Sequence, residues 1–173
     1  SILRGEEYTG ITSMIMADGI DTGDMLLKGV VDIAENDNFE TIHDKLGVCG
    51  AEVLLKTLRE LRAGVLTRTK QDDSLATYAP MLDKTMCPID WSKNARQVHD
   101  HVRGLSPWPV ATATLGGVNF KIHQTAVVEG SGRPGQILEL TKTGLRVACG
   151  EGAVEIRILQ AEGGKRMAAP DYF

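Results

Sequence analysis

The sequence contains no apolar run long enough to cross a membrane. A spanning helix needs roughly 18 consecutive apolar residues, and polar or charged residues interrupt every apolar stretch of this chain before that length is reached. The chain also opens without the basic and then apolar pattern of a secretory signal. These absences argue against a membrane protein or a secreted one, so we expect a cytoplasmic location.

Cysteine is also scarce. The three cysteines, Cys49, Cys87 and Cys149, are an odd number, and none of them forms a C-x-x-C pair. That pattern fits neither a disulfide framework nor a structural zinc site. We therefore expect a reducing compartment and no bound metal.

The four histidines give no metal-binding pattern either. His99 and His101 form an H-x-H pair, but residues two apart on a helix face different directions. His43 falls in an expected helix and His123 in an expected strand. No cysteine or paired histidine stands at ligand spacing, so we expect surface or structural roles for all four.

The net charge of −4 hides an asymmetry along the chain. Residues 1–64 carry 6 lysines and arginines against 12 aspartates and glutamates, whereas residues 65–173 carry 13 against 11. Two interpretations stay open. The difference reflects either ordinary solvated surface or a second half that contacts a polyanion.

The first part of the chain has the pattern of an α/β domain. Apolar and β-branched residues fill 10–16 and 24–33, which predicts two strands joined by a loop. A helix is expected from Asp37, because apolar residues then recur at helical spacing as far as Leu61. Residues 65–84 are polar and lack periodicity, and we expect them to form a linker.

Three features describe that helix further. Asp37 with Glu40 three residues later is typical of an N-cap with a capping box. Gly47 and Gly50 weaken the middle of the helix, which leaves open whether it is continuous or broken there. Gly64 is a favourable residue just past the end of the helix.

Residues 85–173 are expected to form a second, mostly β domain. A short helix follows Ser92, because Ala95, Val98 and Val102 share one side of it. Short strands with turn signals then recur about every ten residues, which is typical of a small antiparallel barrel or sandwich.

The loop between the first two strands concentrates carboxylates. The stretch "ADGIDTGDML" (17–26) holds Asp18, Asp21 and Asp24 together with two glycines. As a calcium loop it lacks further oxygen ligands and the closing glutamate of an EF-hand. Asp and Gly are both common in bent backbone, so composition alone favours an ordinary turn. The alternative is an active-site carboxylate.

Several motifs resemble, in the same order, those of methionyl-tRNA formyltransferases. The stretch "TGITSMIMADGIDTGDMLLK" resembles the strand and folate-side loop of that family, and the resemblance covers essentially the whole chain. The later motifs are "ATYAPML" (76–82), "IDW" (89–91), "SPWP" (106–109) and "ACGEGAVEI" (148–156).

The resemblance implies a fold and an activity. The family joins a Rossmann-like formyl-transfer domain, through a linker, to a C-terminal antiparallel β-barrel resembling an OB-fold. Its members transfer a formyl group from 10-formyltetrahydrofolate, the co-substrate, to the amino group of methionine on initiator tRNA. The chain would then be divided into the C-terminal portion of the formyl-transfer domain (1–64), the linker (65–84) and a tRNA-contacting OB-like domain with a leading helix (85–173).

The resemblance also assigns residues. Of the family's catalytic Asn, His and Asp, only the Asp has a counterpart here, and it is Asp21. The Asn and His belong to an upstream loop, so we expect this chain alone to be inactive. Because the sequence begins at Ser1 rather than Met and stops at Phe173 without a tail, we expect a fragment cut at both ends. Asp24 is expected to stabilise the loop by bonding nearby backbone N–H groups. The expected folate-contacting residues are Asp18, Gly19, Ile20, Asp21 and Thr22.

A basic strip is expected to contact RNA phosphates, because such contacts position RNA without reading its sequence. Trp91 and Trp108 are expected in core or hinge packing, with stacking on RNA bases as the alternative. The residues of the strip are Arg68, Lys70, Lys121, Arg133, Lys142 and Arg146.

Two rival interpretations stay open. Sugar-nucleotide formyltransferases share the folate loop and the β domain, so the formyl acceptor is alternatively a sugar-nucleotide amine. The second rival is a non-catalytic RNA-binding module in which the acidic loop is only a turn. "ATYAPML" followed by "IDW" favours the tRNA enzyme. We expect a monomer without membrane contact.

Overall fold

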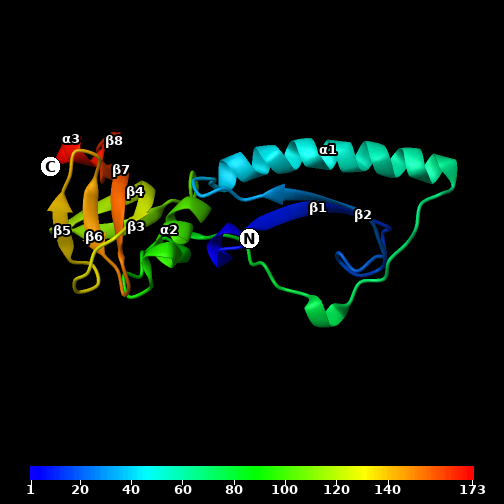
Figure 1. Cartoon of the computed structure of the whole chain (residues 1–173), viewed down its shortest axis with the longest axis horizontal. Coiled ribbons are helices and arrows are strands. Elements are labelled where there is room, and N and C mark those ends of the chain that lie inside the picture. The colour runs from blue at the N-terminus through cyan, green and yellow to red at the C-terminus, as the bar shows by residue number, and fades with distance from the viewer. The chain divides into compact units, whose positions relative to one another are not determined.

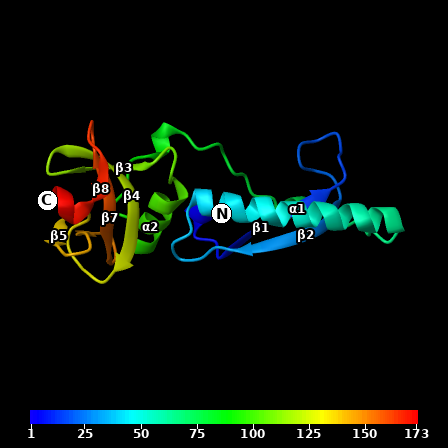
Figure 2. The ribbon, with the colours of Figure 1, turned by 90° about the horizontal axis from the view of Figure 1, so that it is seen from above.

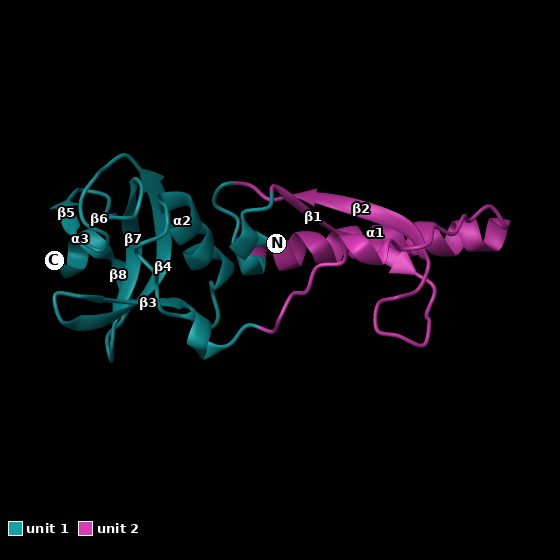
Figure 3. Cartoon of the chain, turned by 90° about the horizontal axis from the view of Figure 1, so that it is seen from below, with its two compact units in different colours: residues 1–6, 35–40, 82–173 teal, residues 7–34, 41–81 magenta.

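The structure, a computed structural model, describes all 173 residues and contains two compact units. Unit 1 consists of residues 1–6, 35–40 and 82–173, and unit 2 consists of residues 7–34 and 41–81 (Figure 3). Two short segments from the first part of the chain therefore belong to the unit that holds the β domain. The domain boundaries expected from the sequence (1–64, 65–84 and 85–173) come from the family resemblance, whereas the two units are defined by compactness. Those domain boundaries stay a prediction.

Unit 2 is built on a hairpin of two antiparallel strands, β1 (Tyr8–Met14) and β2 (Met25–Asp32). Their register runs from Tyr8 opposite Asp32 to Thr12 opposite Lys28, and it shifts before Met14 meets Met25. Both strands predicted from the apolar pattern are confirmed, with bounds moved by one or two residues. The loop that carries the three aspartates joins them.

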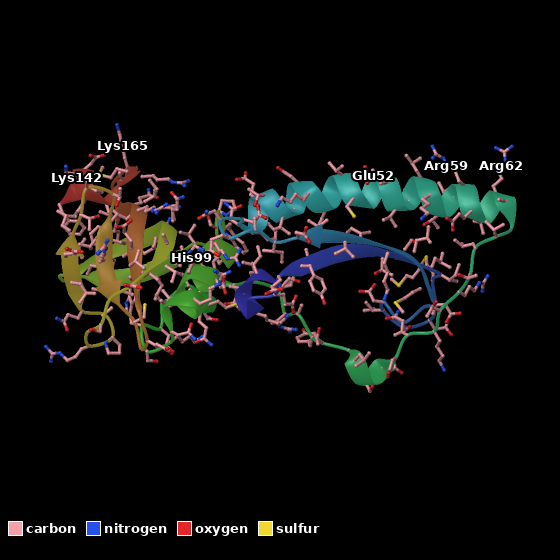
Figure 4. All side chains as sticks on the ribbon, viewed as in Figure 1. Glu52, Arg59, Arg62, His99, Lys142 and Lys165 are labelled. Carbon is pink, nitrogen blue, oxygen red and sulfur yellow. The ribbon has the colours of Figure 1, made fainter.

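Helix α1 (Phe39–Ala63) lies along one face of this hairpin (Figures 1 and 2). The approach is close, since a Cβ atom built on Gly29 of β2 would lie 2.4 Å from the Cys49 sulfur. The hydroxyls of Ser13 and Thr57 form a 2.8 Å hydrogen bond between strand and helix. The charged residues Glu52, Arg59 and Arg62 project from the side of α1 that faces away from the hairpin (Figure 4).

Helix α1 is continuous, with no break in its middle. The helix runs without interruption through Gly47 and Gly50. A Cβ atom on Gly50 would already be 3.7 Å from Ile11, so packing on the hairpin outweighs the weak helix propensity of glycine. The helix ends as expected, with Gly64 in the left-handed region at φ 69. Its N–H donates to Leu61 O, and the next N–H donates to Glu60 O, which is the pattern of a Schellman motif.

Unit 1 contains a six-stranded antiparallel sheet with the strand order β3-β4-β7-β6-β5, and β8 also pairs with β7. The antiparallel strands are confirmed. The expected barrel is not confirmed. Strands β3 and β5 stand at the two ends of the strand order and do not pair with each other, so the sheet does not close. The strands are β3 (Ala111–Leu115), β4 (Val118–Val128), β5 (Ile137–Leu140), β6 (Leu145–Ala148), β7 (Ala153–Ala161) and β8 (Arg166–Ala168).

The leading helix of unit 1 is α2 (Ala95–Gly104). Asn94 caps its first turn, and Asn94 and Gln97 form a reciprocal capping box. Ala95, Val98 and Val102 are buried, as the pattern predicted. The remaining helices are short: η1 (Ile2–Arg4), η2 (Asp73–Leu75), η3 (Lys84–Met86) and α3 (Ala169–Tyr172).

An ion-pair cluster joins residues 35–40 to α2 within unit 1. The Arg103 guanidinium lies 2.7 Å from a carboxylate oxygen of Asp100, and both side chains are almost fully buried. Arg103 also donates a 3.0 Å hydrogen bond to the carbonyl of Asp37. In the first turn of the helix, Arg96 pairs with Glu35. These contacts explain why residues 35–40 belong to unit 1.

A second carboxylate, that of Glu155 on β7, is buried among polar partners. The hydroxyls of Thr141 and Thr143 each donate to it at 3.0 Å, and Arg157 lies 3.5 Å away. Burial raises the pKa of this carboxyl, but the two hydroxyls and Arg157 outweigh burial and hold the pKa below its ordinary value of 4.5. The ionised form is therefore the one that stabilises the fold.

We predict that Glu155→Gln flattens the acid side of the stability curve. A carboxyl whose pKa is lower in the folded state stabilises the fold above the unfolded pKa, and this stability is lost as the pH falls. The midpoint of urea unfolding should thus fall less for the variant than for the wild type between about pH 5 and pH 3. The exposed Glu129→Gln is the control and should keep the wild-type slope. Equal slopes for Glu155→Gln and the wild type would contradict the assignment.

Candidate functional site in the β1–β2 loop

The loop of residues 15–24 closes on itself. The N–H of Ile15 donates to the carbonyl of Asp24 at 3.0 Å. Gly23 is buried beneath this closure, and a Cβ atom there would lie 1.6 Å from the Ile15 carbonyl oxygen. Only glycine fits that position, so close packing of the loop requires Gly23 between Thr22 and Asp24.

The chain that follows α1 returns to this loop and is bonded to it. Met25 and Thr69 exchange two backbone hydrogen bonds of 2.8 Å. The side-chain amide of Gln71 donates to the carbonyls of Asp21 and Gly23, each at 2.7 Å. Residues 69–71, expected as plain linker, thus form a strap that holds the loop from one side.

Asp21 takes an unusual backbone conformation at the point where the strap binds. Its φ is 55, in the left-handed region that few residues other than glycine adopt. Aspartate tolerates this region better than most residues, and such conformations concentrate at functional sites. The Asp21 side chain is exposed. The loop therefore presents a carboxylate, which only accepts hydrogen bonds when ionised, from a fixed backbone.

The neighbouring residues of the loop are exposed as well. Asp18 and Thr22 are exposed, and Ile20 keeps 93% of its surface. A Cβ atom on Gly19 would lie 2.7 Å from the Thr22 hydroxyl, so the backbone is bent tightly here. Asp24, expected to bond backbone N–H groups through its side chain, contributes its carbonyl to the loop closure instead.

The structure contains no group of three or more His, Cys, Asp or Glu side chains that could hold a metal ion. None of its helices combines the length and the apolar character that crossing a membrane requires.

Two of the four histidines, His99 and His101, lie on helix α2. His99 is 2% exposed and hydrogen-bonds with the Thr125 hydroxyl and with the Glu35 carbonyl, each at 3.0 Å. Burial lowers the pKa of His101, which lies on the same helix, below its ordinary value. His99 therefore has a structural role in unit 1.

The six basic residues expected to contact RNA are placed on both units. Arg68 and Lys70 are exposed and flank Thr69 of the strap. Lys121 is exposed on β4, and Arg133 and Lys142 are exposed in turns beside β5. Arg146 differs from the others, because it lies against the carboxylates of Glu139 and Glu155.

Unit 1 also contains a groove that no sequence pattern predicted. Its volume is about 750 Å³. Trp91, partly buried against the core, lines the groove, whereas Trp108 does not line it and is 58% exposed. The lining residues come from the segment 88–91 and from strands β3, β4 and β7 with the turn after β7.

Two family models match the chain. The model described as "Formyl transferase" matches residues 1–58, and the model described as "Formyl transferase, C-terminal domain" matches residues 81–173. The chain belongs to the formyl transferase family. It is similar to a methionyl-tRNA formyltransferase of Geobacter metallireducens, with 44% identity over 171 residues, which cover 99% of this chain and 55% of that protein. The chain thus spans about half the length of this relative.

Solved structures share the fold of this formyl transferase chain. A structure of HypX from Aquifex aeolicus in complex with tetrahydrofolic acid superposes with a TM-score of 0.70 at 19% identity, over 99% of this chain and 31% of that one. An N-formyltransferase from Helicobacter canadensis, in complex with folinic acid and dTDP-3-aminofucose, gives a TM-score of 0.72 at 16% identity. That match covers 96% of this chain and 58% of the other.

We predict that Gln71→Ala loosens the loop but leaves the hairpin intact. The variant removes two hydrogen bonds, each worth about 1 kcal/mol, so the amides of Ile15 and Met25 should exchange with solvent about tenfold faster or more. The amide of Ile33, which bonds Glu7 at the far end of the hairpin, should keep its rate. Hydrogen exchange followed by NMR measures all three, with Lys70→Ala as the control. Unchanged rates at Ile15 and Met25 would show that the strap does not hold the loop.

Proposed function

We propose that this chain forms part of an enzyme that transfers a formyl group from 10-formyltetrahydrofolate to the amino group of methionine on initiator tRNA. The observation that carries the proposal is the exposed carboxylate of Asp21, on a backbone that the strap holds, within the segment that matches the formyl transferase family. The named relative at 44% identity supports the tRNA acceptor. On this proposal, residues 1–64 complete a Rossmann-like domain, residues 65–84 are the linker and residues 85–173 act as an OB-like domain.

The chemistry needs a group such as Asp21. Attack of an amine on the formyl carbon forms a tetrahedral oxyanion, and the departing folate nitrogen needs a proton. A carboxylate beside an imidazole orients the ring and favours its charged form. The charged ring, with an amide donor, then stabilises the oxyanion. Residues 1–173 supply the carboxylate, and by the family resemblance the Asn and His lie outside them, so the chain alone should be inactive.

The exposed residues around Asp21 suit the edge of a pterin ring. Such an edge carries both hydrogen-bond donors and acceptors, and exposed loop backbone offers the same two kinds of group. Residues 18–22 are exposed, so a folate co-substrate has access to them. The structural neighbour HypX holds tetrahydrofolic acid, which supports a folate rather than a metal as the group that docks here.

The rival function, transfer to a sugar-nucleotide amine, differs from the proposed one in the group that accepts the formyl group. The Helicobacter canadensis neighbour holds an amino-sugar nucleotide, but at 16% identity its likeness to this chain concerns the fold alone. Lys70 of the strap and Arg68 just before it favour a polyanionic acceptor. The expectations of a monomer and of a cytoplasmic location stay predictions.

We predict that Asp21→Asn lowers turnover in a full-length formyltransferase in which this chain replaces the matching segment of the Geobacter metallireducens relative. General acid–base contributions of this kind amount to about 10²–10⁴ in kcat, while the KM for tRNA should change little. The exposed Asp73→Asn, also in unit 2, is the control. Formylation is measured with methionyl initiator tRNA and with an amino-sugar nucleotide. Transfer to the sugar alone would refute the tRNA acceptor, and full activity of Asp21→Asn would show that the Asp21 carboxylate has no catalytic role and that the acidic loop is only a turn.

We also predict that Arg68→Ala with Lys70→Ala weakens binding of initiator tRNA to this chain. Each lost phosphate contact should reduce the slope of log Kd against log salt by about 0.7 to 0.9. The double variant Arg59→Ala with Arg62→Ala removes the same charge from the outward side of α1 (Figure 4) and should keep the wild-type slope. Filter binding at several salt concentrations measures both. If the two double variants behave alike, the strap does not contact tRNA.

A further inference from the structure

The groove of unit 1 is formed where an extended segment adds to the edge of the sheet. The N–H of Ile89 donates to Thr112 O at 2.9 Å, and the N–H of Thr112 donates to Cys87 O at 2.7 Å. This parallel pairing places the segment 88–91 beside β3. On the far side, the N–H of Glu162 donates to the carbonyl of Asn119 at 3.0 Å and ties the turn after β7 to β4. Backbone hydrogen bonds therefore fix both walls.

The groove combines apolar and aromatic side chains with a few polar groups. Its volume of about 750 Å³ falls in the range of about 300–1,000 Å³ that is common for small-molecule sites. The apolar lining includes Ile89, Trp91 and Phe120. Of these, Phe120 is 2% exposed, so Trp91 is the aromatic ring with surface available to a ligand.

The polar groups of the lining differ in how far they are already engaged. Gln160 is used twice, because its Nε2 donates to Gly164 O and its Oε1 pairs with His123 Nε2. Asn119 accepts a 2.7 Å hydrogen bond from the Thr114 hydroxyl through its side-chain oxygen, which leaves its amide nitrogen as a donor. Lys121 and Glu162 are exposed and add one charge of each sign.

We propose that this groove binds an unpaired nucleotide of the RNA substrate, with the base stacked beside Trp91. The inference rests on the proposed function, which supplies the RNA. The edge of a base carries both donors and acceptors, and the amide of Asn119 and the carboxylate of Glu162 complement them. The ammonium of Lys121 pairs with the phosphate. The polar rim does not suit a lipid chain.

The two tryptophans of the chain allow a sharp test, because one lines the groove and the other does not. The chain is labelled with 5-fluorotryptophan, and the variants Trp91→Phe and Trp108→Phe assign its two fluorine resonances. A single-stranded hexaribonucleotide and initiator tRNA are then titrated separately. The Trp91 resonance should shift with both RNAs, and the Trp108 resonance should move less.

Affinity variants test the same groove by a second measurement. Stacking on an aromatic side chain contributes enough that Trp91→Leu should weaken binding of the hexaribonucleotide at least about fivefold. Trp91→Phe keeps an aromatic face and should stay within about twofold, which separates stacking from a folding defect. Lys121→Gln should weaken binding about threefold. Lys165→Gln, an exposed lysine of the same unit outside the groove, is the charge-matched control and should have no effect.

The possible outcomes separate this proposal from the proposed function. A Trp91 resonance that stays in place while the chain binds tRNA overturns the nucleotide groove and leaves the formyl-transfer function standing. Failure to bind tRNA at all, together with formylation of the amino-sugar nucleotide alone, overturns both. Equal losses for Lys121→Gln and Lys165→Gln would show a diffuse charge effect, which also contradicts the groove.

Discussion

The two hydrogen bonds from the Gln71 amide to the carbonyls of Asp21 and Gly23 are the constraint on which the candidate site depends. A ten-residue connection between two strands is long enough to adopt many conformations. The Gln71 bonds, the Met25–Thr69 pair and the closure at Ile15 leave Asp21 little freedom. A reactive group held by fixed neighbours loses less conformational entropy when its substrate binds.

Specific polar contacts also fix residues 35–40 against α2. A buried Arg103–Asp100 pair with a further hydrogen bond to the backbone of Asp37 resists separation, because removing one partner leaves a buried charge, at a cost of about 3–5 kcal/mol. The segment between β2 and α1 is therefore part of the folded β unit as well as a connection within the hairpin unit. Anything that displaces this segment also disturbs the helix that precedes the sheet.

Periodicity predicted most of the elements, because it depends only on local sequence. The strands of the hairpin, the long helix and strands β3 to β7 followed from apolar spacing and turn signals, whereas β8 was not predicted. The two glycines left a break in α1 open, and none occurs, since the close approach of Gly50 to Ile11 is tertiary and does not show in a propensity scale. A closed barrel is not confirmed, because strand spacing does not determine which edges meet.

The candidate site could be predicted only in part, for the same reason. The carboxylate loop stood out by composition, and the family resemblance directed attention to Asp21. The Gln71 strap joins residues about 50 positions apart through one side chain, and no pattern in the sequence marks such a pair. The groove beside Trp91 likewise needs four separate segments to come together. The most direct test is a crystal structure of the full-length chimera with bound tetrahydrofolate. We predict that the Asp21 carboxylate lies within about 3.2 Å of an imidazole nitrogen beside the folate. A carboxylate that faces bulk water, more than about 6 Å from any such group, would contradict it.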